Sequence, residues 1–155
     1  MTPEREEVEG ISDRQLVDAL GTFLSAFHWQ VYATPTFKVP VNGHHARQAA
    51  QRWIATLGSD VYAYVAYEKG RAGGRTHCHA LVGGLGGIPT THSGLNLRAL
   101  ALKRVERSWK HGDIKVDQYD PRRGACWYVS KFPTDGEIVG VMKRHRVRHK
   151  GSTQM

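Results

Sequence analysis

The chain has 155 residues, of which 40% are hydrophobic and 23% charged, a composition typical of a globular protein and not of a disordered one. Lysines and arginines number 22 against 14 acidic residues, and the formal charge of +8 favours a polyanionic partner such as nucleic acid. Several acidic residues gather near the N-terminus, so the rest of the chain is more basic than its average. We expect one domain over 1–155, with a core of about 12–142 and a basic tail over 143–155.

The cysteines and the apolar runs bear on the compartment of the protein. Cys78 and Cys126 are too few and too far apart for a disulfide framework, and neither CxxC nor zinc-finger spacing is present. No apolar run approaches the roughly 18 residues that a membrane-spanning helix needs, and the acidic N-terminus lacks the charge order of a signal peptide. We therefore expect a cytoplasmic protein in a reducing compartment, with no membrane partner.

The chain begins with a predicted helix and a predicted strand. Ser12 and Gln15 match a capping box, and apolar residues at helical spacing follow, which predicts a helix over about 13–27. The aromatic and β-branched residues of 29–37 predict the first strand. Pro35 lies inside this strand, so we expect an edge position or a bulge there.

Further helices and strands alternate along the remainder of the chain. Hydrophobic periodicity and turn residues predict, in order, a helix over 44–57, a strand over 61–68, a glycine-rich hairpin tip over 69–75, a strand over 75–83, a helix over 96–110, a strand over 113–119, a helix over 122–132 that ends before Pro133, and a strand over 137–142. Helices inserted among antiparallel strands indicate an α+β fold in which helices cover one sheet.

Two histidines flank one cysteine in the segment RTHCHALVGG. On a strand, His77 and His79 lie on one face and can hold one metal ion, whereas Cys78 points to the other face as a core residue. The hairpin between the two strands places Glu68 near His77. The alternative is that these are ordinary surface histidines in a chain that has nine, and that Glu68 is a solvated carboxylate.

A tyrosine and a lysine form a second candidate group. Tyr128 and Lys131 are three residues apart, so they share one side of a helix. A tyrosine hydroxyl with its usual pKa of about 10 is a poor nucleophile at neutral pH, but a nearby cation stabilises the phenolate. Lys131 can act in this way or can contact a substrate phosphate, and the sequence does not separate these roles.

The two groups together predict a site that cleaves phosphodiesters. Glu68, His77 and His79 offer one carboxylate and two imidazoles, which suit Mn²⁺ or Mg²⁺ and leave positions open for a phosphate oxygen. Tyr128 would attack in line, the 3′-OH would leave, and a covalent phosphotyrosine would store the bond energy for rejoining.

Three ordered blocks resemble motifs of the HUH endonucleases, and within them the rolling-circle replication initiators, or Rep proteins, of small plasmids and of single-stranded DNA phages or viruses. The segment 32–37 is similar to their first-strand motif, His77-Cys-His79 to the HUH motif, and Tyr128-Val-Ser-Lys131 to the YxxK motif. The segment 109–120 resembles their usual lead-in to the tyrosine, so the resemblance covers most of 28–133.

This resemblance implies a five-stranded antiparallel sheet with the histidines on a central strand, flanked by helices. It also implies a metal-dependent enzyme that nicks and joins single-stranded DNA through a 5′-phosphotyrosyl link and so starts rolling-circle replication. Phe132 stands where some members have a second tyrosine, which implies a single-tyrosine enzyme. No GxxxxGK[ST] loop is present, so unwinding would need a host helicase, a separate subunit or a longer parent chain.

The expected nucleic-acid partner is single-stranded DNA or an origin hairpin. Candidate contacts to the DNA backbone, some of which would be no more than solvated charges, are Arg71, Arg75, Arg122, Arg123, Lys143, Arg144, Arg146 and Arg148. Two other functions stay open. One is a single-strand transposase of the same superfamily, and the other is a non-catalytic RRM-like module whose aromatic residues stack bases.

Overall fold

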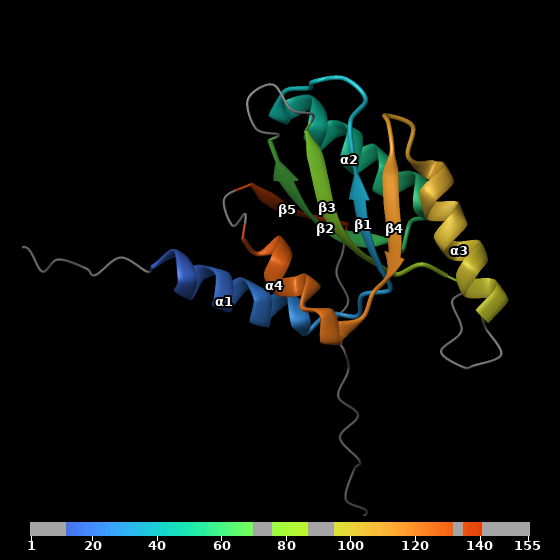
Figure 1. The fold of residues 1–155 in the computed structure, drawn as a ribbon. Helices are drawn as coiled ribbons and strands as arrows, with labels where there is room; N and C mark the ends of the chain where they lie inside the picture. The colour runs from blue at the N-terminus through green and yellow to red at the C-terminus, as the bar shows by residue number, and fades with distance from the viewer. Residues whose placement is uncertain (1–11, 70–75, 87–94, 132–134, 141–155) are drawn as a thin grey trace, which may run out of the picture.

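The computed structural model describes residues 12–69, 76–86, 95–131 and 135–140. The elements in chain order are α1 (Asp13–Ser25), β1 (Val31–Pro35), α2 (Gly43–Leu57), β2 (Tyr62–Glu68), β3 (His77–Gly83), α3 (Leu95–Ser108), β4 (Ile114–Gln118), a 3₁₀ helix (Pro121–Arg123), α4 (Ala125–Val129) and β5 (Gly136–Val139). The five strands form one antiparallel sheet in the order β4-β1-β3-β2-β5, with helices on both faces (Figure 1). The predicted α+β class is therefore confirmed. None of the helices in these described ranges has the length and apolar character required to cross a membrane.

Pro35 is neither at an edge nor in a bulge, contrary to the prediction. β1 lies between β4 and β3, and its pairing with β4 keeps one register along the whole strand. Its pairing with β3 includes Ala33, and an isolated bridge between Thr36 and His77 continues the same register beyond Pro35. Proline has no N–H to donate to a neighbouring strand. Pro35 is tolerated in this interior strand because it is the last residue of β1 and lies between Ala33 and Thr36, the residues that pair with β3 on either side of it.

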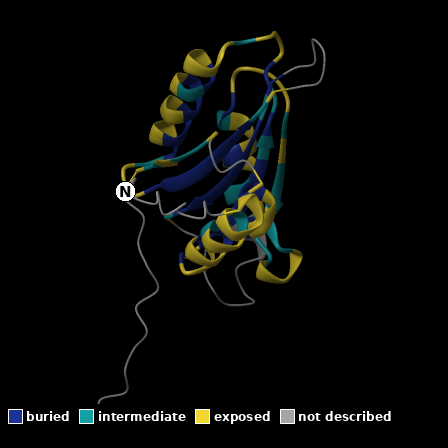
Figure 2. Ribbon diagram, turned by 90° about the vertical axis from the view of Figure 1, so that its left-hand side faces the viewer, coloured by how far each residue is buried: buried dark blue, intermediate teal, exposed yellow. Residues whose placement is uncertain are grey.

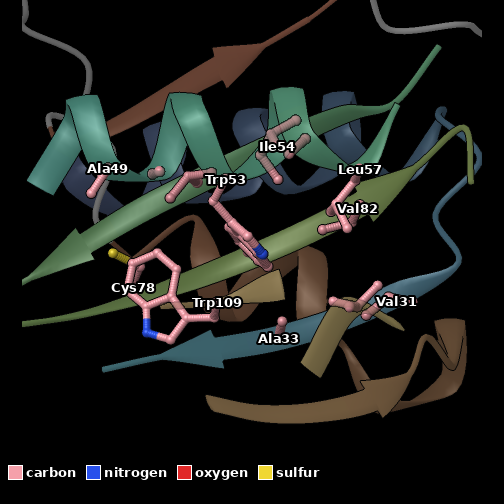
Figure 3. Close-up of a cluster of buried hydrophobic side chains, with 14 of the residues drawn as sticks. Val31, Ala33, Ala49, Trp53, Ile54, Leu57, Cys78, Val82 and Trp109 are labelled. Atoms are coloured by element: carbon pink, nitrogen blue, oxygen red, sulfur yellow. The ribbon is translucent and has the colours of Figure 1, made fainter. Parts of the chain in front are cut away.

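The face of the sheet under α2 and α3 holds the larger hydrophobic core. Trp53 of α2 and Trp109 after α3 meet edge to face, with ring centroids 5.5 Å apart (Figure 3). The Trp53 indole N–H donates to Ser108 Oγ at 2.7 Å, which ties the two helices together. Cys78 is fully buried in this core, so the predicted separation of Cys78 from the two histidines is confirmed.

The opposite face of the sheet is covered by α1 and α4. Leu24 of α1 and the buried Cys126 and Val129 of α4 pack over alternate residues of β2 and β3. A Cβ atom on Gly21 would lie 2.6 Å from the Trp127 ring, so the glycine allows the two helices to approach closely. Figure 2 shows the strands largely buried and the outward faces of the helices exposed.

The segment predicted as one helix over 122–132 is a 3₁₀ turn followed by a short helix. Gly124 between them has φ of +70°, a left-handed conformation that interrupts a right-handed helix. α4 then ends at Val129, so Lys131 lies in the turn after the helix and not on it. By contrast, the capping box of α1 forms as predicted, with Ser12 and Gln15 satisfying each other's backbone N–H groups.

Candidate metal centre and nucleophile

The register of the β2–β3 hairpin brings a carboxylate and two imidazoles together. Glu68 is the last residue of β2 and lies directly opposite His77, the first residue of β3, with His79 two residues further on the same face. Glu68 Oε2 is 2.7 Å from His77 Nε2 and 2.8 Å from His79 Nε2. One ligand atom from each residue lies within 4.8 Å of the others, so this group can hold a metal ion.

The protonation states that the surroundings favour are those of metal ligands. The hydrogen bond from His79 lowers the pKa of Glu68, which keeps the carboxylate charged. Burial lowers the pKa of His79 and keeps its imidazole neutral. Divalent cations bind carboxylates and neutral imidazoles, so the donor set fits such an ion. The His79 side chain is only 6% exposed, whereas those of His77 and Glu68 are 29% and 34% exposed, so the group opens to solvent on one side.

Tyr32 of β1 holds the far side of the buried imidazole. Its hydroxyl is 3.0 Å from His79 Nδ1, and the two rings lie almost parallel, at 10°. Both nitrogens of His79 therefore have a partner, with Glu68 on Nε2 and Tyr32 on Nδ1. Burial raises the pKa of Tyr32 to about 12, so the phenol keeps its proton at neutral pH. A partner on the second ring nitrogen orients a metal-binding histidine and fixes its tautomer.

The sequence interpretation placed Tyr32 in a motif but assigned it no role at the site. Strand alternation limits Tyr32 to one face of β1, but its contact with His79 depends on the register between β1 and β3, two strands that lie far apart in the sequence. The available signal was the aromatic residue at the centre of the predicted first strand.

Tyr128 lies beside His79, and Lys131 lies beside Tyr128. The Tyr128 ring meets that of His79 edge to face, with centroids 5.0 Å apart, and Tyr128 is 40% exposed to solvent. Lys131 Nζ lies 4.7 Å from the centroid of the Tyr128 ring, so the pair meets although Lys131 follows the end of α4. The structure thus brings a phenol, an ammonium and the candidate metal ligands to one place.

Of the predicted DNA contacts, Arg122 and Arg123 are described and both are exposed. Arg122 Nε is 3.1 Å from Asp120 Oδ1, so its charge is already paired. Arg123 lines a pocket of about 330 Å³ to which Tyr32 and Tyr128 also contribute. The other predicted contacts lie outside the described residues, namely Arg71, Arg75, Lys143, Arg144, Arg146 and Arg148.

Comparisons with known proteins do not assign the chain to a family. No family model, curated protein or solved structure matches the sequence or the fold. What is known of the site therefore rests on the geometry of the Glu68, His77 and His79 group and of the tyrosine beside it.

Proposed function

We propose that this protein is a metal-dependent endonuclease that nicks and rejoins single-stranded DNA with a tyrosine nucleophile. The observation that carries the proposal is the convergence of Tyr128 from α4 with Glu68, His77 and His79 from the β2–β3 hairpin. A phenol next to a metal-binding group has a direct use in phosphoryl transfer, because the attacking oxygen and the site that binds the phosphate must lie close together.

The residues have distinct tasks in this reaction. Mn²⁺ or Mg²⁺, when bound to Glu68, His77 and His79, supplies positive charge that polarises the scissile phosphate. Tyr128 loses its proton to solvent and attacks the phosphorus in line, so that a bond from the phenol oxygen to phosphorus forms as the bond to the 3′-oxygen breaks. The 3′-oxygen leaves with the electron pair and takes up a proton. Lys131, beside the Tyr128 ring, stabilises the phenolate as it develops.

A free 3′-OH can reverse this reaction by attacking the phosphotyrosine, which rejoins the strand. The resemblance of three motifs to rolling-circle initiators supports a role in starting replication on single-stranded DNA or an origin hairpin, with a host helicase to unwind the duplex. The non-catalytic alternative needs exposed aromatic residues on the sheet. Tyr62 and Tyr64 are 2% and 4% exposed, so they are covered and do not offer stacking surfaces.

The proposal is tested by a denaturing gel of the protein with labelled single-stranded oligonucleotides, in Mn²⁺ or in EDTA. We expect a protein–DNA band that requires the metal and is lost in Tyr128→Phe. Tyr119→Phe is the matched control, because it removes a hydroxyl that contacts Cys126 within the same region and leaves Tyr128 in place. A wild-type protein that binds DNA over a broad pool but never forms the band would contradict the proposal.

A further inference from the structure

A basic groove lies between the end of α2 and the last turns of α3. It has a volume of about 550 Å³ and is lined by Thr56, Leu57, Lys103, Arg104, Arg107, Ser108 and Lys110. Four of these seven residues are cations and none of the seven is acidic. Glu106 belongs to the same helix and is exposed, but it does not line the groove.

Hydrogen bonds between α2 and α3 fix the positions of the two helices that line the groove. Arg104 donates a hydrogen bond to the carbonyl of Leu57, at the C-terminal end of α2. Ser108 Oγ accepts from the Trp53 indole and donates to the Val105 carbonyl at 2.6 Å, so α2 and α3 are joined below the groove. Arg104 thereby offsets the partial negative charge at the end of α2. The charges of Lys103, Arg107 and Lys110 are left for a ligand.

Some cations of the protein are paired with carboxylates, whereas these three, which share one groove, form no ion pair with an acidic residue among the described residues. Arg47, Lys115 and Arg122 each form an ion pair with a nearby carboxylate. Within the described part of the chain, no ion pair involves Lys103, Arg107 or Lys110. Lysines and arginines that gather around one groove without counter-charges repel each other, and a polyanion relieves that repulsion.

We propose that this groove binds the phosphate backbone of double-stranded DNA. The seven lining residues include no aromatic side chain, and aromatic stacking is what proteins use to hold the bases of a single strand. Flexible cations without stacking residues instead suit the regular phosphates of a duplex, which they contact without reading the sequence. The choice of DNA rests on the proposed function, whereas the polyanion site rests on the groove alone.

The groove and the candidate nucleophile lie on opposite faces of the sheet. α3 packs with α2 over one face, while α4 packs with α1 over the other (Figure 1). The nucleotides at Tyr128 therefore cannot be those that occupy the groove. The protein would hold two segments of its target, a single strand beside Tyr128 and a duplex arm across the α2–α3 face.

The test measures the affinity for a labelled duplex by fluorescence anisotropy in EDTA, over a series of salt concentrations. The variants are Arg107→Gln and the double variant Lys103→Gln/Arg107→Gln, both at exposed positions. The matched control is Arg14→Gln, which removes one exposed arginine from α1 on the other face. We expect the slope of log affinity against log salt concentration to become shallower by about 0.9 for each groove cation removed. The affinity itself should decrease by the same factor for any duplex sequence.

Two results would overturn the inference. One is a groove variant that binds the duplex like Arg14→Gln. The other is an equal loss of affinity for a single strand of the same length, which would show that the groove does not select a duplex. The groove variants should also form the covalent band on a short single strand at the wild-type level. If the wild-type protein does not form this band but the groove variants lose duplex binding, the proposed chemistry is refuted and the inference about the groove stands.

Discussion

Replacing Tyr32 by phenylalanine removes one hydroxyl from the contact with His79 and leaves the aromatic ring in place. The hydroxyl is 3.0 Å from His79 Nδ1, and Glu68 faces the other nitrogen of the same imidazole. When Nε2 binds a metal ion, Nδ1 must carry the proton and donate it. Tyr32 then accepts that hydrogen bond, and the phenylalanine of the variant offers no acceptor.

The loss can be estimated from the environment of the imidazole. His79 is 5% exposed, so water does not readily replace the phenol as the partner of Nδ1. The metal draws electron density from the ring and strengthens the N–H···O bond, so the loss is larger with the metal bound than without it. Removing such an outer partner typically weakens metal binding by about 10- to 100-fold, which corresponds to roughly 1.4 to 2.7 kcal/mol.

Isothermal titration with Mn²⁺ measures this effect on wild type, on Tyr32→Phe and on the control Tyr119→Phe. We expect weaker binding in Tyr32→Phe alone. Thermal unfolding in EDTA separates positioning from general stability. If Tyr32→Phe lowers the unfolding temperature but binds Mn²⁺ as tightly as the wild type, then Tyr32 only stabilises the fold and the reasoning is refuted.

Further predictions concern the carboxylate of Glu68, the packing of α1 against α4 and the buried phenol of Tyr62. Glu68→Gln should weaken Mn²⁺ binding more than Tyr32→Phe does while leaving the circular dichroism spectrum unchanged, and wild-type affinity would contradict the ligand role. Gly21→Ala should destabilise the protein to urea by about 1–3 kcal/mol because its Cβ meets the Trp127 ring; a gain of about 1 kcal/mol would mean that helix propensity prevails. Burial raises the pKa of Tyr62, which donates to the His28 carbonyl at 2.6 Å. The stability that this phenol contributes is complete below its unfolded pKa of about 10 and is lost as the pH rises through its folded pKa. Above a pH of about 10, the urea midpoint of Tyr62→Phe should therefore decrease less than that of the wild type. Equal decreases in the two midpoints would refute this prediction.

Local patterns were sufficient to predict that Glu68, His77 and His79 come together as a group that can hold a metal ion. Strand alternation placed His77 and His79 on one face, and the short hairpin set the position of Glu68, so each relation spans few residues of sequence. The contact between Tyr128 and His79 could not be derived from spacing. It depends on the docking of α4 against the sheet, and it was expected only because the chemistry of the two groups is complementary and their order resembles that in a known family.

Other features depended on the tertiary structure or on single backbone angles. Pro35 was expected at an edge because proline lacks an N–H, but its place at the end of β1 makes an interior position acceptable. The break at Gly124 depends on a left-handed φ that composition does not specify. The basic groove was missed although Lys103, Arg107 and Lys110 have helical spacing, because only the packing of α3 against α2 shows which described residues line it and that no carboxylate is among them.

Because α4 is short, we expect the two parts of the candidate site to differ in local stability, with Tyr128 on the less stable part. Glu68, His77 and His79 belong to strands paired on both sides, whereas the helix that carries Tyr128 has five residues and is held by its buried side chains. An isolated helix of this length is not stable in water, so α4 forms only because it packs against the rest of the protein. Amide hydrogens of α4 should therefore exchange with solvent through local opening while those of β2 and β3 remain protected. If Tyr128 is the nucleophile that we propose, it would be able to move away with its attached strand while Glu68, His77 and His79 keep their places.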